Sequence, residues 1–311
     1  SNICTCDCFY CGIRRSNKDV VRYQLAKAQI LHQAKWCVER GFGSVVLQSG
    51  ERRDARFVDF VTDVVRTVKK ETRCSLLPDG LGITLCVGEQ SREVYARFFE
   101  AGAHRYLLRI ETASPRLFRR WHPAEQTFEG RRRCLSHLRS IGYQVGTGVM
   151  IGAPWQTTAD LANDVAFFKE MDVDVIGMGP YIPHHAAPLA RIDVPLPAMR
   201  LQRALSTIAV ARLVLRDVNI AATTALQTLS PFGRERGLDF GANVIMPQVT
   251  SPDCRKQYML YDAKPCNDET DPGFQNALER RIRNLGREVG RNRWGDSPHA
   301  WIRQAFTRGA A

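Results

Sequence analysis

Four cysteines lie within the first eleven residues, and three of them, Cys4, Cys8 and Cys11, follow the spacing C-x3-C-x2-C. Three thiolates on one short loop can hold three irons of a 4Fe–4S cluster. The fourth iron then has no protein ligand, and an open coordination position is typical of catalytic rather than structural metal sites. We therefore predict a 4Fe–4S cluster with one open iron at this loop.

Zinc is the alternative, with Cys6 as a fourth ligand, but the four cysteines do not form the paired C-x2-C units of zinc ribbons. We interpret Cys6 as an extra thiol near the cluster. A disulfide scaffold is typical of short secreted chains with poor cores, which this chain is not. Four further cysteines lie in periodic or apolar stretches and are predicted to be buried thiols: Cys37, Cys74, Cys86 and Cys134.

The composition is that of a globular protein, with 311 residues, 44% hydrophobic and 24% charged. No apolar run approaches the ~18–20 residues of a membrane-spanning helix, so we predict no membrane partner. The net charge of +12 raises an RNA-binding module or scaffold as an alternative. RNA-binding proteins interleave aromatic and basic residues on one surface, whereas this excess is spread along helices, so we predict no nucleic-acid partner. A basic face could equally dock an acidic protein.

Short apolar strands alternate with amphipathic helices along the chain, and this order predicts a parallel sheet with right-handed crossovers. The expected strands are residues 44–48, 83–87, 105–109, 144–148, 175–179, 219–222 and 243–246. The expected helices are residues 25–40, 55–70, 92–101, 128–141, 158–170 and 198–215. No G-x-G-x-x-G follows the first strand, which argues against a doubly wound sheet.

Eight such units would close into a TIM-type (β/α)8 barrel. The chain begins without Met, so we expect an excerpt of a longer protein, with residues 1–3 as the tail of a first strand that is otherwise missing. We expect the barrel over residues 1–250, and a closing extension with a basic tail over residues 251–311. Polar and glycine-rich strings follow the expected strands, at the carboxyl ends where barrel enzymes carry their sites.

The three-cysteine motif on the first loop of a barrel resembles the radical S-adenosylmethionine (radical SAM) superfamily. The resemblance implies that the open iron chelates the methionine moiety of the cofactor, and that electron transfer cleaves it to a 5′-deoxyadenosyl radical. Ser49, Gly50 and Glu51 match the turn that contacts the cofactor's amino group. Glu111 is suited to ribose hydroxyls, and Arg131 to the carboxylate by charge-assisted bonds. Alternatively, Glu111 is a helix N-terminal acid and Arg131 part of a solvated face.

A closer resemblance, over residues 1 to about 261, is to the HydE-type maturases of FeFe-hydrogenase. It rests on the strings SNxCxxxCxYCGxRRxNK, VVLQSGE, RYLLRIETA, MGPYIPH, APLA, IAATTA and GANVIMPQ. The resemblance implies a barrel with a long internal cavity and radical chemistry on a small organometallic or sulfur-containing substrate. The product would serve assembly of the dithiolate-bridged diiron subcluster of the H-cluster, from a cysteine-bound iron carbonyl–cyanide precursor. The positions that match the cavity lining are Thr84, Arg109, Thr223, Thr224 and Tyr258, with Tyr261 beside them.

The same resemblance implies other hydrogenase maturases of the scaffold GTPase type as partners, and a reductant such as ferredoxin. Cluster chemistry implies a reducing, low-oxygen compartment: cytoplasm in a prokaryote, chloroplast or another organelle matrix in a eukaryote. An alternative within the superfamily is an enzyme of the biotin synthase or methylornithine synthase type acting on a small metabolite. Biotin synthase would need barrel cysteines and an arginine that hold a sacrificial cluster, and no matching set is present.

Several positions depart from the family pattern. Only Cys266, with Cys254 twelve residues earlier, lies in the region where some relatives carry a second cluster, so we predict none. Ile110 replaces a histidine common beside Glu111. Residues 74–81 form an insertion with the turn signature Pro-Asp-Gly. His184 and the residue after it are expected to be ordinary polar surface rather than metal ligands.

Overall fold

A six-stranded sheet of entirely parallel strands forms the centre of the computed structural model, which describes residues 1–309. Its strands, in spatial order, are β1 (Ser44–Gln48), β2 (Gly82–Cys86), β3 (Arg105–Leu107), β4 (Gln144–Thr147), β6 (Val175–Ile176) and β8 (Asn219–Ile220). The spatial order equals the chain order, so each crossover moves to the next strand, as in the wall of a barrel. The predicted α/β fold is confirmed.

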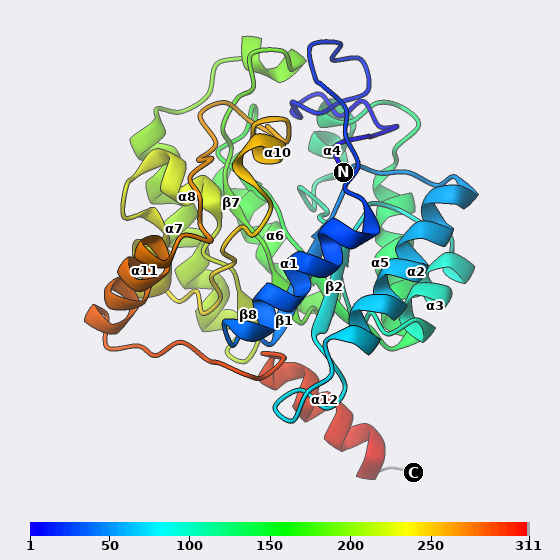
Figure 1. Cartoon of the computed structure of the whole chain (residues 1–311). Helices are drawn as coiled ribbons and strands as arrows, with labels where there is room; N and C mark the ends of the chain where they lie inside the picture. The colour runs from blue at the N-terminus through cyan, green and yellow to red at the C-terminus, as the bar shows by residue number, and fades with distance from the viewer. Residues whose placement is uncertain (310–311) are drawn as a thin grey trace.

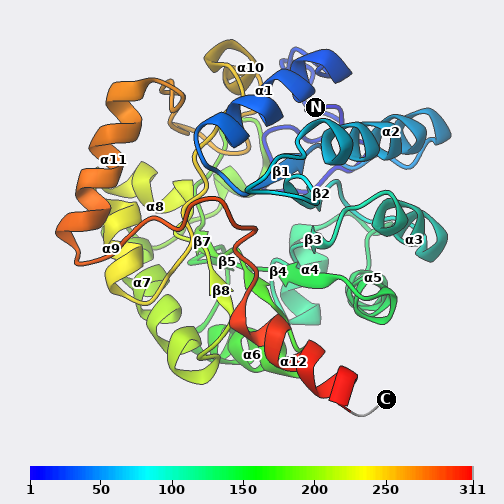
Figure 2. The same cartoon turned by 60° about the horizontal axis from the view of Figure 1, so that its bottom comes forward.

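Helices surround the sheet on its outer side (Figures 1 and 2). The helices of the described residues are α1 (Lys27–Glu39), α2 (Ala55–Glu71), α3 (Arg92–Glu100), α4 (Pro115–Trp121), α5 (Phe128–Ile141), α6 (Thr158–Glu170), α7 (Pro197–Val214), α8 (Thr224–Leu229), α9 (Gly233–Asp239), α10 (Pro252–Lys256), α11 (Pro272–Asn284) and α12 (Pro298–Gly309), with a 3-10 turn at Pro188–Arg191. Of these, α10 and α12 lie at opposite ends of the molecule rather than in this outer layer. The inner face of α2 buries Phe57, Val61, Val65 and Val68, which recur at helical spacing. None of the described helices is long and apolar enough to cross a bilayer.

Several strands are shorter than the sequence predicts. A second parallel pair, β5 (Met150–Ile151) with β7 (Gly179–Pro180), continues β4 and β6 beyond a break. The break lies where two backbones approach closely, since a side chain at Gly148 would collide with the Gly177 carbonyl. Over the predicted strand 243–246, the structure has only a single parallel bridge between Ala221 and Val244. Residues 1–3 form no strand but lie against the end of β1, where the Ser1 carbonyl accepts a bond from the Gly50 N–H (3.0 Å).

The segment between α11 and α12 crosses the amino-terminal ends of the strands, as Figure 2 shows. Arg105, the first residue of β3, donates to the Trp294 carbonyl (3.0 Å) and pairs with Asp296 (3.1 Å). Ser44, the first residue of β1, also donates to the Trp294 carbonyl. The Trp294 indole donates to the Gly80 carbonyl (2.8 Å). The segment between α11 and α12 therefore covers the amino-terminal ends of the strands. Barrel enzymes carry their sites at the opposite, carboxyl ends.

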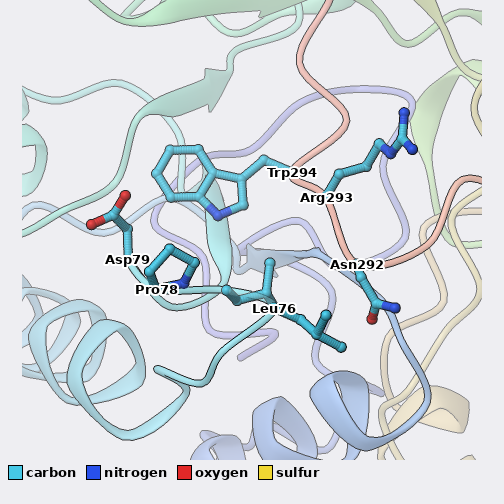
Figure 3. Close-up of a pocket in the computed structure, with 7 residues that line it drawn as sticks. Leu76, Pro78, Asp79, Asn292, Arg293 and Trp294 are labelled. Carbon is cyan, nitrogen blue, oxygen red and sulfur yellow. The ribbon is translucent and has the colours of Figure 1, made fainter.

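The predicted insertion at residues 74–81 is a surface turn against this segment. Gly80 has a φ of +70°, which favours glycine. Figure 3 shows a shallow hollow at the junction, lined by Leu76, Leu77, Pro78, Asp79, Asn292, Arg293 and Trp294. Cys74 is exposed on the turn, so the prediction that this thiol is buried is wrong. An inserted turn can lie outside the hydrophobic core although its sequence is partly apolar, which explains the exposure of Cys74.

Replacing Asp296 with alanine is expected to lower the free energy of unfolding by about 3 kcal/mol, because it leaves the buried Arg105 guanidinium without its counter-charge. Urea unfolding at neutral pH measures the change. Asp253→Ala removes an exposed carboxylate and is the matched control. Equal urea midpoints for the two variants would show that the segment adds no stability through this ion pair.

Candidate functional site

The cysteine loop is fixed by backbone bonds to the turn that follows β1. Thr5 N–H donates to the Glu51 carbonyl (2.9 Å), and Glu51 N–H points at the Cys4 sulfur (3.3 Å). A side chain at Gly50 would collide with the Ile3 carbonyl and lie 2.6 Å from the Cys4 Cβ. Only glycine therefore lets the turn pass beneath the loop.

The far side of the loop is held by three other parts of the chain. Phe9 N–H donates to the Trp121 carbonyl at the end of α4 (2.9 Å), and the Phe9 carbonyl accepts from Leu189 N–H (2.9 Å). Gly12 N–H donates to the Leu260 carbonyl (2.9 Å) in the segment after α10. The loop lies at the end of the molecule opposite to α12 (Figure 1). The structure thus places the cysteines over the carboxyl ends of the strands.

The three thiols suit a cluster better than a single ion. Burial raises the pKa of Cys11 to about 12 and raises that of Cys8, so both thiolates need a cation beside them. The ligands of one zinc ion, at about 2.3 Å each, stand about 4 Å apart. Among the described residues, only His184, His185 and Asp262 bring three ligand atoms within 4.8 Å of one another. The sulfurs of Cys4, Cys8 and Cys11 are therefore not all within 4.8 Å of one another, an arrangement that suits separate irons better than one shared ion.

Cys6 shares a hydrogen bond with Cys4. This bond lowers the pKa of Cys4 to about 7 and raises that of Cys6. Cys6 therefore lies beside Cys4, one of the three predicted cluster ligands.

Glu111 has the features of a ligand-binding carboxylate. It is buried just beyond β3, and burial raises its pKa. Its Oε2 has no hydrogen-bond partner, while Oε1 lies 3.3 Å from the Arg109 Nε. Its φ of 66° is the left-handed conformation, which costs a non-glycine residue about 1–2 kcal/mol and occurs preferentially at functional sites. The free oxygen is placed to accept a bond from a ligand hydroxyl.

Arg131 is buried in the first turn of α5 and already has partners in the protein. Its Nε donates to the Glu89 carboxylate (2.5 Å), and its Nη1 donates to the Arg109 carbonyl (2.6 Å). Glu89 also pairs with Arg53 (3.0 Å), and Arg53 pairs with Glu51 (2.7 Å). This network joins the turns after β1 and β2 to α5. The solvated-face alternative for Arg131 is wrong, because its side chain is buried.

Asp164, which the sequence reasoning missed, holds the turn after Glu111. Its Oδ1 accepts the Ala113 N–H (2.5 Å) and lies 3.4 Å from the Thr112 hydroxyl, and Oδ2 has no partner. Burial raises its pKa to about 7. A buried aspartate facing a strand end from a neighbouring helix gives no local sequence signal, because its partners are about 50 residues away.

Asp164→Asn is expected to flatten the dependence of stability on pH. A carboxyl with a raised pKa in the folded state stabilises the fold while it is protonated, and this stability is lost as the pH rises toward the folded pKa. Between pH 5 and pH 8 the unaltered protein should therefore lose about 3 kcal/mol more than the variant. Urea unfolding of both proteins at the two pH values measures the difference. Parallel pH curves would contradict a raised Asp164 pKa.

The predicted cavity residues fall into separate groups. Arg109 lies beside Glu111 and donates to the Val149 carbonyl (2.9 Å). Tyr258 is buried between the cysteine loop and the end of β2. Its burial and the nearby Cys86 and Cys11 thiols raise its pKa. Cys86, predicted only as a packing thiol, therefore belongs to this site. It lies two residues beyond Thr84 in β2, so the two side chains share a face of the strand.

The three predicted cavity threonines, Thr84, Thr223 and Thr224, each have a hydrogen-bond partner within the protein. The Thr84 hydroxyl accepts from the Arg105 Nε (3.1 Å), which places it toward the covered amino-terminal ends of the strands. β8 ends at Ile220, so Thr223 and Thr224 lie beyond the strand, and Thr224 is the first residue of α8. The Thr223 hydroxyl donates to the Met178 carbonyl (3.2 Å), and that of Thr224 accepts from Arg234 (3.3 Å).

Tyr261 lies in the segment that follows α10, and His185 lies against this segment. Tyr261 is largely buried beside Thr228, and burial raises its pKa to about 12. Asp262 accepts from the His185 N–H (2.9 Å) and lies 2.8 Å from its Nδ1. His185 therefore helps to dock this segment onto the loop after β7, and His184 is buried, so the expectation of ordinary polar surface is wrong for His184.

Comparison with known proteins gives a consistent set of relatives. The model of the radical SAM superfamily matches residues 1–168. The [FeFe] hydrogenase maturase subunit HydE of Thermotoga maritima is 43% identical over 299 residues, covering 95% of this chain and 80% of that protein. Biotin synthase of Streptomyces avermitilis is 26% identical over 71% of the chain, which spans about half of that enzyme (54%).

Solved structures share the fold. Methylornithine synthase matches with a TM-score of 0.75 and 22% identity, over 94% of this chain and 81% of that one. The hydrogenase maturase HydG matches with a TM-score of 0.65 and 19% identity, over 79% of this chain and 54% of that one. At these identities the likeness concerns the arrangement of the chain alone.

Proposed function

Because this chain belongs to the radical SAM superfamily, we propose that it is an enzyme that cleaves S-adenosylmethionine reductively at a 4Fe–4S cluster. We propose further that it uses the resulting radical on a small substrate during assembly of the dithiolate-bridged diiron subcluster of FeFe-hydrogenase. One observation carries the first part: a loop with three spread thiols is fixed over the strand ends, close to a buried carboxylate with a free oxygen.

Cys4, Cys8 and Cys11 would hold the cluster through three irons. When bound, the cluster supplies the open iron and the electron that convert the cofactor into a 5′-deoxyadenosyl radical. Glu111 would accept hydrogen bonds from the ribose hydroxyls through its free Oε2. The turn Ser49–Glu51 would present backbone to the methionine amino group, because its glycine permits close approach.

Arg131 would act on the cofactor carboxylate from a fixed position. Its Nε and Nη1 are taken by Glu89 and a carbonyl, so the guanidinium is held in one orientation. Such preorganisation lowers the entropic cost of binding a ligand. The same contacts leave fewer donors for the cofactor than a free arginine would offer.

The substrate class follows from the HydE relative, which matches nearly the whole chain at 43% identity. We infer a small organometallic or sulfur-containing substrate in the space bounded by Arg109, Cys86 and Tyr258. Burial of Tyr258 beside the cluster loop would exclude water there. Water exclusion protects a reactive radical from side reactions.

Other hydrogenase maturases, including a scaffold GTPase, and a reductant such as ferredoxin are the partners we propose. The net charge of +12 favours encounter with an acidic electron donor. We place the protein in a reducing, low-oxygen compartment, where an iron–sulfur cluster survives.

A reconstituted hydrogenase-maturation mixture that lacks its HydE-type component tests this function. Adding the cluster-loaded chain is expected to restore hydrogen production by the apo-hydrogenase, and heat-denatured chain is the control. If hydrogen production stays at background while the chain still forms 5′-deoxyadenosine, the enzyme acts on another small metabolite, as biotin synthase or methylornithine synthase types do.

A further inference from the structure

Arg255, in α10, is a fully buried cation whose guanidinium nitrogens have no hydrogen-bond partner. Its side chain is 1% exposed, yet Nε, Nη1 and Nη2 all lack a hydrogen-bond partner. A guanidinium stays protonated in proteins and carries five N–H donors. An unpaired buried charge is strongly destabilising. An acceptor that the chain itself does not supply is therefore expected at this position.

The nearest carboxylate does not fill this role. Asp268 Oδ1 lies 4.0 Å from Arg255 Nη2, at the limit of an ion pair. That oxygen already accepts from the Thr270 N–H (3.0 Å) and hydroxyl (2.6 Å), and the Asp268 side chain is half exposed. The next residue, Glu269, instead forms a close buried pair with Arg234 (2.9 Å). The segment therefore contains a close buried ion pair at Glu269, but no close ion pair at Arg255.

Lys264 brings a second, half-buried cation to the same segment. Its Nζ donates to the Tyr258 carbonyl (3.0 Å) and lies 5.0 Å from the centre of the Tyr258 ring. Burial lowers its pKa to about 8, and the Arg255 charge contributes to this decrease. Tyr258 N–H in turn donates to the Arg255 carbonyl (2.9 Å). The Lys264 ammonium and the Arg255 backbone therefore both contact Tyr258, and among the described residues no carboxylate lies within 4.0 Å of both cations.

We propose that Arg255 and Lys264 form an anion-binding site that takes a carboxylate or a similar small oxyanion. The planar guanidinium suits two oxygens of one group, and the lysine adds a point charge. α10 lies at the end of the molecule that carries the cysteine loop (Figure 1), and the Leu260 carbonyl accepts a bond from Gly12 in that loop. An anion here would order the segment that carries Tyr258. The proposal does not depend on the radical reaction.

Thermal unfolding and titration calorimetry of the cluster-loaded full chain test this site with acetate, and acetamide is the neutral probe of the same shape. Acetate is expected to raise the melting temperature saturably, and acetamide to leave it unchanged. Arg255→Gln should abolish the acetate shift, and Arg255→Lys should weaken binding about tenfold, because a point charge replaces the fork. Arg216→Gln, at an exposed arginine, should bind like the unaltered protein.

Two further arms identify the source of the anion. L-cysteine that binds more tightly than acetate, and loses this binding in Arg255→Gln, indicates the carboxylate of an amino-acid-like substrate. Inorganic phosphate that binds more tightly than either indicates a free anion at the same site.

The stability of each variant without added anion shows whether the variant folds normally. In low-salt buffer Arg255→Gln should be at least as stable as the unaltered protein, since it removes an unpaired charge. Asp268→Asn should bind acetate normally. The proposal is overturned if acetate and acetamide act alike. It is also overturned if Arg255→Gln and Asp268→Asn both destabilise the anion-free protein by the same amount, because Asp268 would then be the counter-ion of Arg255.

Discussion

Cys8→Ser is expected to lower the rate of 5′-deoxyadenosine formation at least a thousandfold, a loss of about 4 kcal/mol in transition-state stabilisation. The Cys8 thiol is partly buried and lies 3.1 Å from the Gln126 side-chain oxygen, so a water molecule or a distant thiol has little access to replace it. A hydroxyl does not ligate iron as a thiolate does, and two remaining thiolates leave two irons without protein ligands. Iron and sulfide content after anaerobic reconstitution, followed by product chromatography, measures both losses.

Cys74→Ser is the matched control for this experiment, because it makes the same atomic change on an exposed turn far from the loop. It should retain full iron content and activity. Activity in Cys8→Ser equal to that of the control would remove Cys8 from the ligand set.

Glu111→Gln is expected to weaken the binding of S-adenosylmethionine about 10- to 100-fold without loss of iron, because charge-assisted hydrogen bonds contribute about 1.5–3 kcal/mol. The variant keeps the side-chain shape but removes the charge on the free Oε2. The folded protein should not lose stability, since a buried carboxylate with one unpaired oxygen is costly before the ligand binds. Anaerobic equilibrium dialysis gives the affinity, and urea unfolding gives the stability.

Glu93→Gln serves as the control, because Glu93 is an exposed carboxylate on α3. Unchanged cofactor affinity in Glu111→Gln, or a loss of the same size in Glu93→Gln, would show that Glu111 does not contact the cofactor.

Local signals made much of the fold predictable. Helices α5 and α6 begin and end at the residues expected from the sequence, because Thr127 and Thr157 cap their first turns and Gly142 adopts the left-handed conformation after α5. The strands were less predictable. Their hydrogen-bonded lengths depend on where neighbouring backbones approach, as at Gly148 and Gly177, and one strand's sequence does not contain that information.

The candidate site divides in the same way. The cysteine spacing could be read from the sequence, because all three ligands lie on one loop. The roles of Asp164 and Arg255 could not be read in this way, because the first depends on residues distant in the chain and the second on burial without a hydrogen-bond partner. Thr84 and Cys86 illustrate the boundary: alternation places them on one face of β2, but only the pairing of Thr84 with Arg105 shows which of them lies near the covered end.

The most direct test of the central claim is the formation of 5′-deoxyadenosine by the anaerobically reconstituted chain with S-adenosylmethionine and dithionite. We predict that the product forms with the cluster-loaded protein and dithionite, and that omitting either iron or dithionite abolishes it. A protein that carries a full complement of iron and sulfide on its loop and still releases no 5′-deoxyadenosine would contradict the assignment of this site to radical chemistry.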